Sequence, residues 1–221
     1  MALFITFEGT EGCGKSTQIA LLSEYLEQNA APYVMTKEPG GSAVCKKIRE
    51  LLLHSENSDI RPKAELLLYA ADRAQHVEEI LSPALREGKT VLCDRYLDAT
   101  VAYQGYGRGL DLDLVGELNG LSSGGLMPDL TFLIDCPVET GIGRALKRAE
   151  SEGSREIRFE NEHISFHEKV KKGYMAIAAA CPERVVVVDG TLSVEKLHET
   201  ILEIYLDKAG SPAAGSEREL R

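Results

Sequence analysis

A glycine-rich segment near the N-terminus, residues 9–16, carries the residue types that bind nucleotide phosphates. It fits the pattern G-x-x-x-x-G-K-[ST], in which glycines let the backbone curl so that successive N–H groups point at phosphate oxygens. The apolar residues 3–7 predict a strand before it, and Lys15–Gln28 predict a helix whose positive end adds to the anion site. We therefore expect Lys15 to reach the β- and γ-phosphates of a nucleoside triphosphate and the Ser16 hydroxyl to bind Mg²⁺.

An adjacent acid and base, Asp94 and Arg95, follow another short apolar run, residues 90–93. An acid at the end of a strand can hold Mg²⁺ directly or through water, opposite Ser16, and the arginine can clamp a phosphate through two parallel hydrogen bonds. The alternative is a surface ion pair at the start of a helix. We favour the functional role, because ligands bind at the carboxyl ends of parallel strands.

Two further groups of side chains are spaced to share helix faces and to contact a nucleoside. Tyr103 and Gln104 follow Thr100 by three and four residues, so a helix would bring a hydroxyl, a phenol and an amide to one side. Tyr69 and Arg73 are four residues apart, so that a ring could stack on a base while a guanidinium donates to its carbonyl. The spacing alone fits an alternative equally well, in which the aromatic side chains pack in the core and the guanidinium of Arg73 extends into solvent.

Short apolar runs alternate with longer helical patterns along the chain. Strands are predicted at residues 3–7, 33–36, 90–93, 130–135 and 185–189. Their nearly continuous apolar character is typical of a parallel sheet buried on both faces, and the helices between them indicate a three-layer α/β domain with a five-stranded sheet. Residues 1–206 are expected to form this single domain, and residues 207–221, rich in small and charged residues, a disordered tail.

The composition argues against several classes of protein. The 221 residues carry a net charge of −10 with a pI near 5.1, whereas nucleic-acid binders present basic faces, so no nucleic-acid partner is expected. No apolar run has the length of a membrane span and no secretory signal is visible, so no membrane partner is expected. The five cysteines are scattered, which favours reduced thiols in the cytoplasm. Cys13 precedes a predicted helix, and we expect it to be a reactive thiol that bound nucleotide protects.

In their order, these motifs resemble the bacterial thymidylate kinases, a family of P-loop nucleoside monophosphate kinases. The resemblance runs from about Leu3 to about Leu206. It is carried by residues 7–18, Glu38-Pro39-Gly40-Gly41 with Ile48-Arg49, residues 68–73 with Gln75-His76-Val77, Asp94-Arg95-Tyr96 with Ala102-Tyr103-Gln104-Gly105, Pro128-Asp129-Leu130-Thr131 before Asp135, and Arg158-Phe159-Glu160. The glycine-rich loop alone would indicate only a nucleotide phosphotransferase, whereas the ordered set indicates this family.

The resemblance implies ATP-dependent phosphorylation of dTMP to dTDP with Mg²⁺, on a P-loop NTPase fold that forms a homodimer. On the ATP side it implies phosphate contacts from the loop and an adenine contact from Arg144, a set that comprises Gly9, Thr10, Glu11, Gly12, Cys13, Gly14, Lys15, Ser16, Thr17 and Arg144. On the dTMP side it implies contacts from Glu11, Glu38, Pro39, Arg49, Tyr69, Arg73, Arg95, Thr100, Tyr103 and Gln104.

Individual roles also follow from the resemblance. Tyr69 would stack on thymine, and Arg49 and Arg95 would hold the dTMP phosphate. Glu11 would lie near the sugar 3′-hydroxyl and the metal, which Ser16 and Asp94 would bind. Tyr103 would crowd the 2′ position and disfavour ribonucleotides. The helices that begin near Lys63 and Tyr96 are the candidates for a dimer interface.

Members of the family place a catalytic arginine either in the glycine-rich loop or in a mobile lid. The loop has no base between Gly9 and Gly14, so the lid, residues 149–159, is expected to supply it. We predict Arg155 and Arg158 for this role, with support from Arg148, so that the catalytic set is Glu11, Lys15, Arg95, Arg155 and Arg158. A phosphate oxygen is already ionised at neutral pH, so no histidine is expected to act as a base. The five histidines are predicted to be surface or packing residues.

Two other functions stay open at this point. One is a kinase for another nucleoside monophosphate, against which Tyr69, Arg73 and Tyr103 argue. The other is a P-loop switch protein that hydrolyses ATP slowly and signals through a partner. That second alternative leaves the polar group at residues 94–104 without a role.

Overall fold

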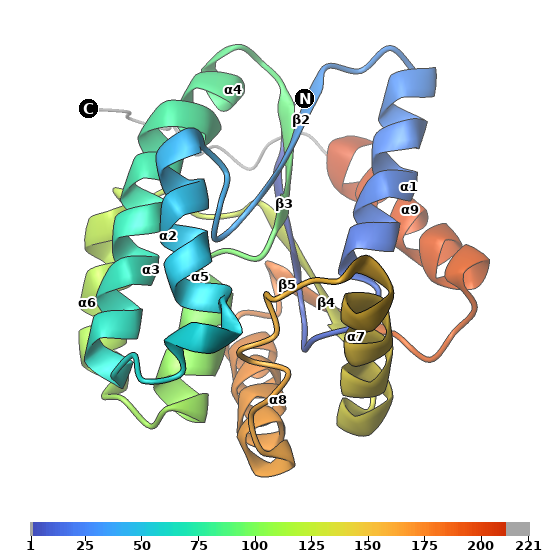
Figure 1. Ribbon diagram of the computed structural model, residues 1–221. Helices are drawn as coiled ribbons and strands as arrows, with labels where there is room; N and C mark the ends of the chain where they lie inside the picture. Colours follow the sequence, from blue (N-terminus) through green and yellow to red (C-terminus); the bar gives the residue numbers. More distant parts are fainter. Residues whose placement is uncertain (1, 211–221) are drawn as a thin grey trace.

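A five-stranded parallel sheet forms the centre of the computed structural model, which describes residues 2–210 (Figure 1). Its strands are β1 (Phe4–Glu8), β2 (Tyr33–Lys37), β3 (Thr90–Asp94), β4 (Leu130–Asp135) and β5 (Val185–Asp189), in the order β2-β3-β1-β4-β5. The predicted α/β class and five-stranded parallel sheet are confirmed. Three predicted strands end one residue early, because the polar residues Glu8, Lys37 and Asp94 continue them to the rim of the sheet.

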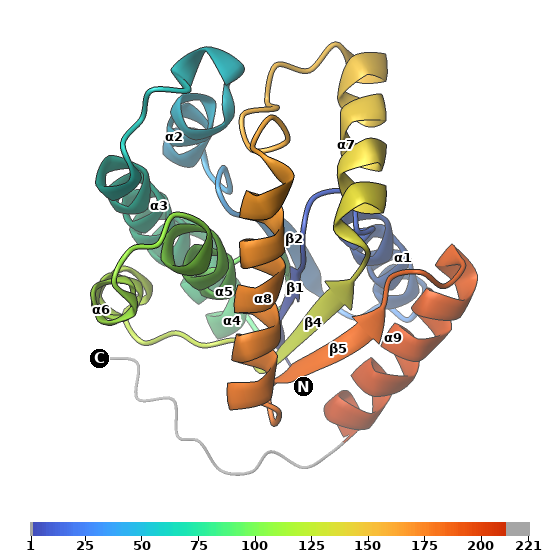
Figure 2. The same ribbon diagram turned by 90° about the horizontal axis from the view of Figure 1, so that it is seen from below.

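Helices cover both faces of the sheet. α1 and α9 pack together on one face, and α3, α6 and α8 lie over the other, with α2 against α3 (Figures 1 and 2). The helix bounds are α1 Lys15–Gln28, α2 Ala43–Leu53, α3 Pro62–His76, α4 Ser82–Arg86, α5 Leu97–Thr100, α6 Leu112–Ser123, α7 Val138–Glu152, α8 Ile164–Ala180 and α9 Val194–Gly210, with a 3₁₀ turn η1 at Ser55–Asn57 and π-helical segments η2 at Val77–Leu81 and η3 at Val101–Gly107.

Alternating residues of β1 build the two cores. Ile5 and Phe7 point into the cluster that α1 and α9 cover, where Phe7 meets Phe132 at 5.3 Å between ring centroids. Phe4 points to the opposite face and meets Tyr96 edge-on at 5.0 Å. Because the strand is buried on both sides, each of these side chains contributes about 2–3 kcal/mol of burial free energy. This holds the strand that leads into the glycine-rich loop in place.

Helix α9 corrects the predicted start of the tail. Residues 207–221 were predicted to form a disordered tail, but α9 continues to Gly210. The reason is the packing of its last turns, since Tyr205 belongs to the α1–α9 core and Ala209 packs against it. The remaining residues of the predicted tail, 211–221, lie outside the described part of the chain.

The fold brings the carboxyl ends of all five strands to one rim. Phe7 and Lys37 both pair with Asp94, which aligns the ends of β1, β2 and β3. The segments that follow these strands are therefore neighbours although they are far apart in sequence. Within residues 2–210, no helix is both long enough and apolar enough to cross a membrane.

Candidate active site

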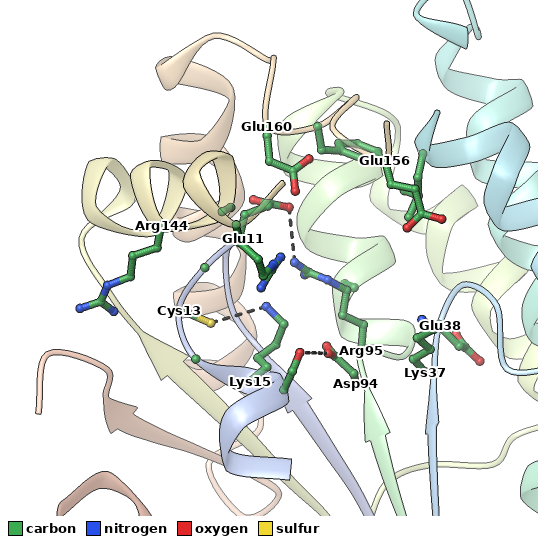
Figure 3. Close-up of a pocket in the computed structure, with 18 of the residues that line it drawn as sticks. Glu11, Cys13, Lys15, Lys37, Glu38, Asp94, Arg95, Arg144, Glu156 and Glu160 are labelled. Atoms are coloured by element: carbon green, nitrogen blue, oxygen red, sulfur yellow. Dashed lines mark hydrogen bonds and ion pairs between the residues drawn. The ribbon is translucent and has the colours of Figure 1, made fainter. Parts of the chain in front are cut away.

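One cavity of about 700 Å³ opens along this rim, a size typical of sites for small ligands. It is lined by most of the residues that the sequence analysis selected: Glu11, Gly12, Cys13, Gly14, Lys15, Ser16, Thr17, Glu38, Pro39, Arg49, Tyr69, Arg73, Asp94, Arg95, Thr100, Tyr103, Gln104 and Arg144. Figure 3 shows Glu11, Lys15, Asp94 and Arg95 gathered around a common space, with Glu156 and Glu160 beyond them. Gly9 and Thr10, at the start of the loop, face β4 and α8 instead of this cavity, and Arg155 and Arg158 do not line it.

The glycine-rich loop is closely packed against the end of the sheet and α7. A Cβ on Gly9 would lie 2.5 Å from the Ile134 carbonyl oxygen, and one on Gly12 would lie 2.0 Å from that of Gly141. Both positions have positive φ, at 136° and 64°, so glycine is required for space and for conformation. The backbone of the loop therefore curves around the cavity and places Lys15 at the N-terminus of α1.

Lys15 is held over the loop by backbone carbonyls. Its Nζ donates to Gly9 O at 3.2 Å and to Thr10 O at 2.9 Å, and it lies 3.5 Å from Cys13 Sγ. The Cys13 side chain is only 1% exposed, which does not favour the reactive thiol that the sequence predicts. The ammonium group thus lies inside the curve of the loop, where it would face a bound anion.

A hydroxyl and a carboxylate meet at the start of α1. Ser16 Oγ donates to Asp94 Oδ2 at 3.0 Å. Both groups line the cavity, and such hard oxygen donors are the ligands that Mg²⁺ accepts in nucleotide sites. The donor set therefore fits the predicted magnesium site.

Arg95 is fixed from several directions. Its φ is 69°, a left-handed conformation that costs a non-glycine residue about 1 kcal/mol or more. Its Nη1 donates to Gly9 O and to Tyr174 Oη, both at 2.9 Å, and its Nη2 donates to Glu11 Oε1 at 3.3 Å. The guanidinium also lies over the Tyr103 ring, 4.9 Å from its centroid. Strain of this kind persists where surrounding contacts impose it, as at functional sites.

Glu11 is the carboxylate at the centre of this network. Tyr103 Oη donates to its Oε1 at 2.5 Å, and His167 Nδ1 lies 3.2 Å from its Oε2. Burial acts to raise the pKa of Glu11, but contact with His167, the charge of Arg95 and the Tyr103 hydroxyl together lower that pKa to about 2. Glu11 is therefore ionised at every physiological pH. Burial raises the pKa of Glu160, which lies beyond it toward the lid (Figure 3).

The predicted base-binding residues meet across α3, α5 and η3. Arg73 is 1% exposed, and it donates through Nη1 to Asn119 Oδ1 at 2.7 Å and through Nη2 to Thr100 Oγ1 at 2.8 Å. Each Nη nitrogen carries a second N–H for a ligand. Gln104 Nε2 donates to Glu65 Oε1 at 2.8 Å. The predicted helix widens into the π-helix η3 after Thr100, a feature frequent at functional sites.

Glu38 holds Arg73 in position through an ion pair. Its Oε2 accepts from Arg73 Nε, and its Oε1 contacts His76 Nδ1, both at 2.9 Å. Glu38 and His76 are buried. Glu38 therefore orients the arginine through a buried ion pair in addition to forming the cavity wall.

Asp72 lies next to the ion pair of Glu38 and Arg73, and its pKa leads to a prediction about how stability depends on pH. Its Oδ1 accepts from Gly40 N at 3.0 Å, while its buried Oδ2 has no hydrogen-bond partner among the described residues. Burial and the charge of Glu38 raise the pKa of Asp72 from 3.8 to about 7. Because the folded pKa is raised, the contribution of Asp72 to stability is full at low pH and is lost as the pH rises through 7.

Asp72→Asn is therefore expected to be more stable than the wild type, by about 2 kcal/mol more at pH 8 than at pH 5. Denaturant unfolding at the two pH values measures this difference. Asp59→Asn, at an exposed aspartate, is the control and should show no such change. An Asp72→Asn advantage that is the same at both pH values would show that Asp72 titrates normally.

The two lid arginines that were predicted to be catalytic, Arg155 and Arg158, do not line the cavity in the structure. Arg158 is 6% exposed and donates to Leu52 O at 3.0 Å and to Glu65 Oε2 at 2.5 Å, so it is part of the protein interior. The Arg155 side chain is 71% exposed and pairs with Glu56 at 3.4 Å. Arg158 is buried against Glu65 and Arg155 is directed to solvent, so neither guanidinium group lies at the cavity. Arg148, on the last turns of α7, lines the cavity instead.

Several residues of the site had no role in the sequence analysis. His76 and His167, predicted to be surface or packing residues, are both buried against site carboxylates. Tyr174 links Arg95 to Glu8, since it donates to Glu8 Oε2 at 2.7 Å. The spacing of His167 and Tyr174 on one helix face is the only sequence signal for them. Lys37, Glu156 and Glu160 also line the cavity.

The fold and the loop define a P-loop nucleotide-binding protein of the α/β class. Its cavity extends past the loop to Arg49, Arg73 and Arg95. The comparisons with known proteins narrow this class. The family model for thymidylate kinase matches residues 7–201, and the chain belongs to the thymidylate kinase family.

Individual relatives cover nearly the whole chain. The thymidylate kinase of Citrifermentans bemidjiense is 58% identical over 96% of this chain and 98% of its own length. That of Trichlorobacter lovleyi is 51% identical over 95% of this chain and 100% of its own length. The crystal structure of thymidylate kinase from Ehrlichia chaffeensis has a TM-score of 0.74 at 33% identity and covers 92% of this chain and 98% of that one.

Proposed function

We propose that this protein transfers the γ-phosphoryl group of ATP to dTMP, forming ADP and dTDP. Two findings support the proposal: the family membership of the chain and one observation of the structure. A single cavity is lined at one end by the phosphate loop with Lys15, and at the other by Arg49, Arg95 and the predicted base-binding residues. Two phosphate-bearing ligands that share this cavity would place their phosphates against each other.

The ATP side consists of the loop and α7. Backbone N–H groups of residues 11–17 would bind the phosphates, and Lys15 would exchange the carbonyls of Gly9 and Thr10 for the β- and γ-phosphates. Arg144 is exposed at the edge of the cavity, where its planar guanidinium would pack on the adenine. Ser16 and Asp94 would bind Mg²⁺, which would neutralise charge that develops on the phosphate oxygens.

The dTMP side consists of α2, α3, α5 and η3. Tyr69 would stack on thymine and Arg73 would donate to a base carbonyl through its second N–H groups, while Glu38 keeps the guanidinium in place. Thr100 and Gln104 would contribute polar contacts beside the base. Arg49, at the Pro39 carbonyl, and Arg95 would bind the phosphate. Tyr103, tied to Glu11, would exclude a 2′-hydroxyl.

The reaction needs alignment and charge neutralisation. A dTMP phosphate oxygen would attack the γ-phosphorus of ATP in line, the new P–O bond would form, and the bond to the β–γ bridging oxygen would break to release ADP. The attacking oxygen is already ionised, so no general base is required. Lys15 and Arg95 would neutralise the repulsion between the two anions, while ionised Glu11 would orient Arg95 and the sugar hydroxyl. Arg148 would reach the transferred group when the lid closes.

A homodimer and a cytoplasmic location complete the proposal. Leu67 on α3 and Leu121 on α6 are exposed at 56% and 80%, on two helices that pack together. Large exposed apolar side chains on neighbouring helices fit an interface between copies of the chain. The five cysteines are free thiols in the structure, as expected in a reducing compartment.

Acceptor selectivity tests the proposed substrate. ADP formation from ATP and Mg²⁺ would be measured with dTMP, dUMP, UMP, dCMP and dGMP as acceptors. We expect strong turnover on dTMP, weaker turnover on dUMP and little with the others. Equal turnover on all five would remove the assigned roles of Tyr69, Arg73 and Tyr103.

A further inference from the structure

The lid carries a carboxylate that binds one of the two arginines assigned to the dTMP phosphate. Arg49 Nε donates to both carboxylate oxygens of Glu156, at 3.2 and 3.0 Å, and Arg49 Nη2 donates to Glu156 Oε2 at 2.7 Å. The remaining terminal nitrogen, Nη1, donates to Pro39 O at 2.9 Å. The lid therefore occupies the side of the guanidinium that forms paired hydrogen bonds.

A phosphate would need the same donors. The two-pronged face of an arginine binds carboxylate and phosphate oxygens with similar geometry. Both Arg49 and Glu156 line the cavity, beside Lys37 (Figure 3 shows Lys37 and Glu156). Burial lowers the pKa of Lys37, the charge of Arg49 lowers it further, and the charge of Glu156 opposes both effects. The carboxylate thus balances a cluster of positive charge that would otherwise attract an anion.

Glu156 is held at this place by its neighbours in the chain. Ser55 N donates to Arg155 O at 2.9 Å, and Arg158 N donates to Leu53 O at 3.2 Å. These bonds connect the backbone on each side of Glu156 to the end of α2, the helix that carries Arg49. The pair consequently belongs to an ordered contact between the lid and α2, in which the carboxylate is directed at the arginine.

We propose that Glu156 determines the affinity for the acceptor nucleotide, because its carboxylate competes with the acceptor's phosphate for Arg49. This proposal rests on the proposed function of Arg49 as a dTMP phosphate ligand. When dTMP binds, the phosphate displaces the carboxylate, and the lid loses its contact with α2 at this point. Thymidine has no phosphate and does not compete, so Glu156 weakens the binding of the nucleotide and leaves that of the nucleoside unchanged.

The test is calorimetric titration of the full chain with dTMP and with thymidine, in the absence of ATP. Glu156→Gln keeps the shape of the side chain and removes its charge. We expect the Kd for dTMP to fall about two- to fivefold, as for the loss of a partly exposed ion pair, and the Kd for thymidine to stay the same. Glu152→Gln is the matched control, since Glu152 is a lid residue that lines the cavity and is not a partner of Arg49. It should leave both constants unchanged.

The other outcomes would overturn the proposal. An unchanged or higher Kd for dTMP in Glu156→Gln would show that the carboxylate does not compete, and equal tightening of dTMP and thymidine would show a general effect on the lid. Thermal unfolding of both variants verifies that each is folded. Failure of the proposed function would look different, because wild-type protein would then bind another monophosphate in place of dTMP. The same titrations with that monophosphate and its nucleoside would still test Glu156.

Discussion

Lys15→Ala is expected to lower kcat for dTMP phosphorylation about a thousandfold, with little change in thermal stability. Lys15 is 7% exposed and its ammonium group is held between two loop carbonyls, so solvent screens its charge less than at the surface. When ATP binds, that charge would face the oxygens on which negative charge develops during transfer. Its removal should therefore destabilise the transition state more than the bound substrates.

Steady-state kinetics with saturating ATP and dTMP, together with the thermal unfolding midpoint, measure this effect. Lys172→Ala, at an exposed lysine on α8 that does not line the cavity, is the control and should keep wild-type kcat. A Lys15→Ala enzyme with a kcat within tenfold of the wild type would mean that the loop lysine takes no part in transfer.

Arg148→Ala should also reduce kcat about a thousandfold, the lower end of the effect of an arginine finger. Arg148 is exposed on the last turns of α7 and lines the cavity, so its loss should not affect folding. Arg158→Ala is expected to behave in the opposite way. It removes a buried partner of Glu65 and should cost about 3 kcal/mol of stability, while the folded fraction keeps a kcat near that of the wild type.

Kinetics and denaturant unfolding of the two variants separate a catalytic from a structural arginine. The buried position of Glu65 explains the large stability effect, because loss of Arg158 leaves Arg108 as the one charged partner of this carboxylate among the described residues. If Arg158→Ala folds normally and loses a thousandfold in kcat, the lid must rearrange so that Arg158 leaves Glu65 and reaches the phosphates. The assignment of Arg148 would then be wrong.

The parts of the molecule that could be predicted from the sequence are those fixed by local pattern. Continuous apolar runs marked the five strands, and the spacing of glycines with Lys15 and Ser16 marked the phosphate loop. The rule that ligands bind at the carboxyl ends of parallel strands placed Asp94 and Arg95 beside that loop. Each of these inferences needs only neighbouring residues and the direction of the chain.

The roles that the sequence could not assign depend on partners distant in the chain. Arg158 is directed inward by Glu65, which lies 93 positions away, and Tyr174 reaches Glu8 across 166 positions. The charge and spacing of residues in the lid do not predict that Arg158 pairs with a buried acid while Arg155 is directed to solvent. For the same reason the contact of His167 with Glu11 could not be seen before the helices were placed around the sheet.

Direct phosphoryl transfer from ATP to dTMP is the central claim, and transfer of label from [γ-³²P]ATP tests it most directly. The protein would be incubated with Mg²⁺, labelled ATP and dTMP, and the nucleotides would then be separated. We expect the label to appear in dTDP, in an amount equal to the ADP formed, and to depend on dTMP. Label that appears in inorganic phosphate at a rate independent of dTMP would contradict the account and would indicate a slow ATPase.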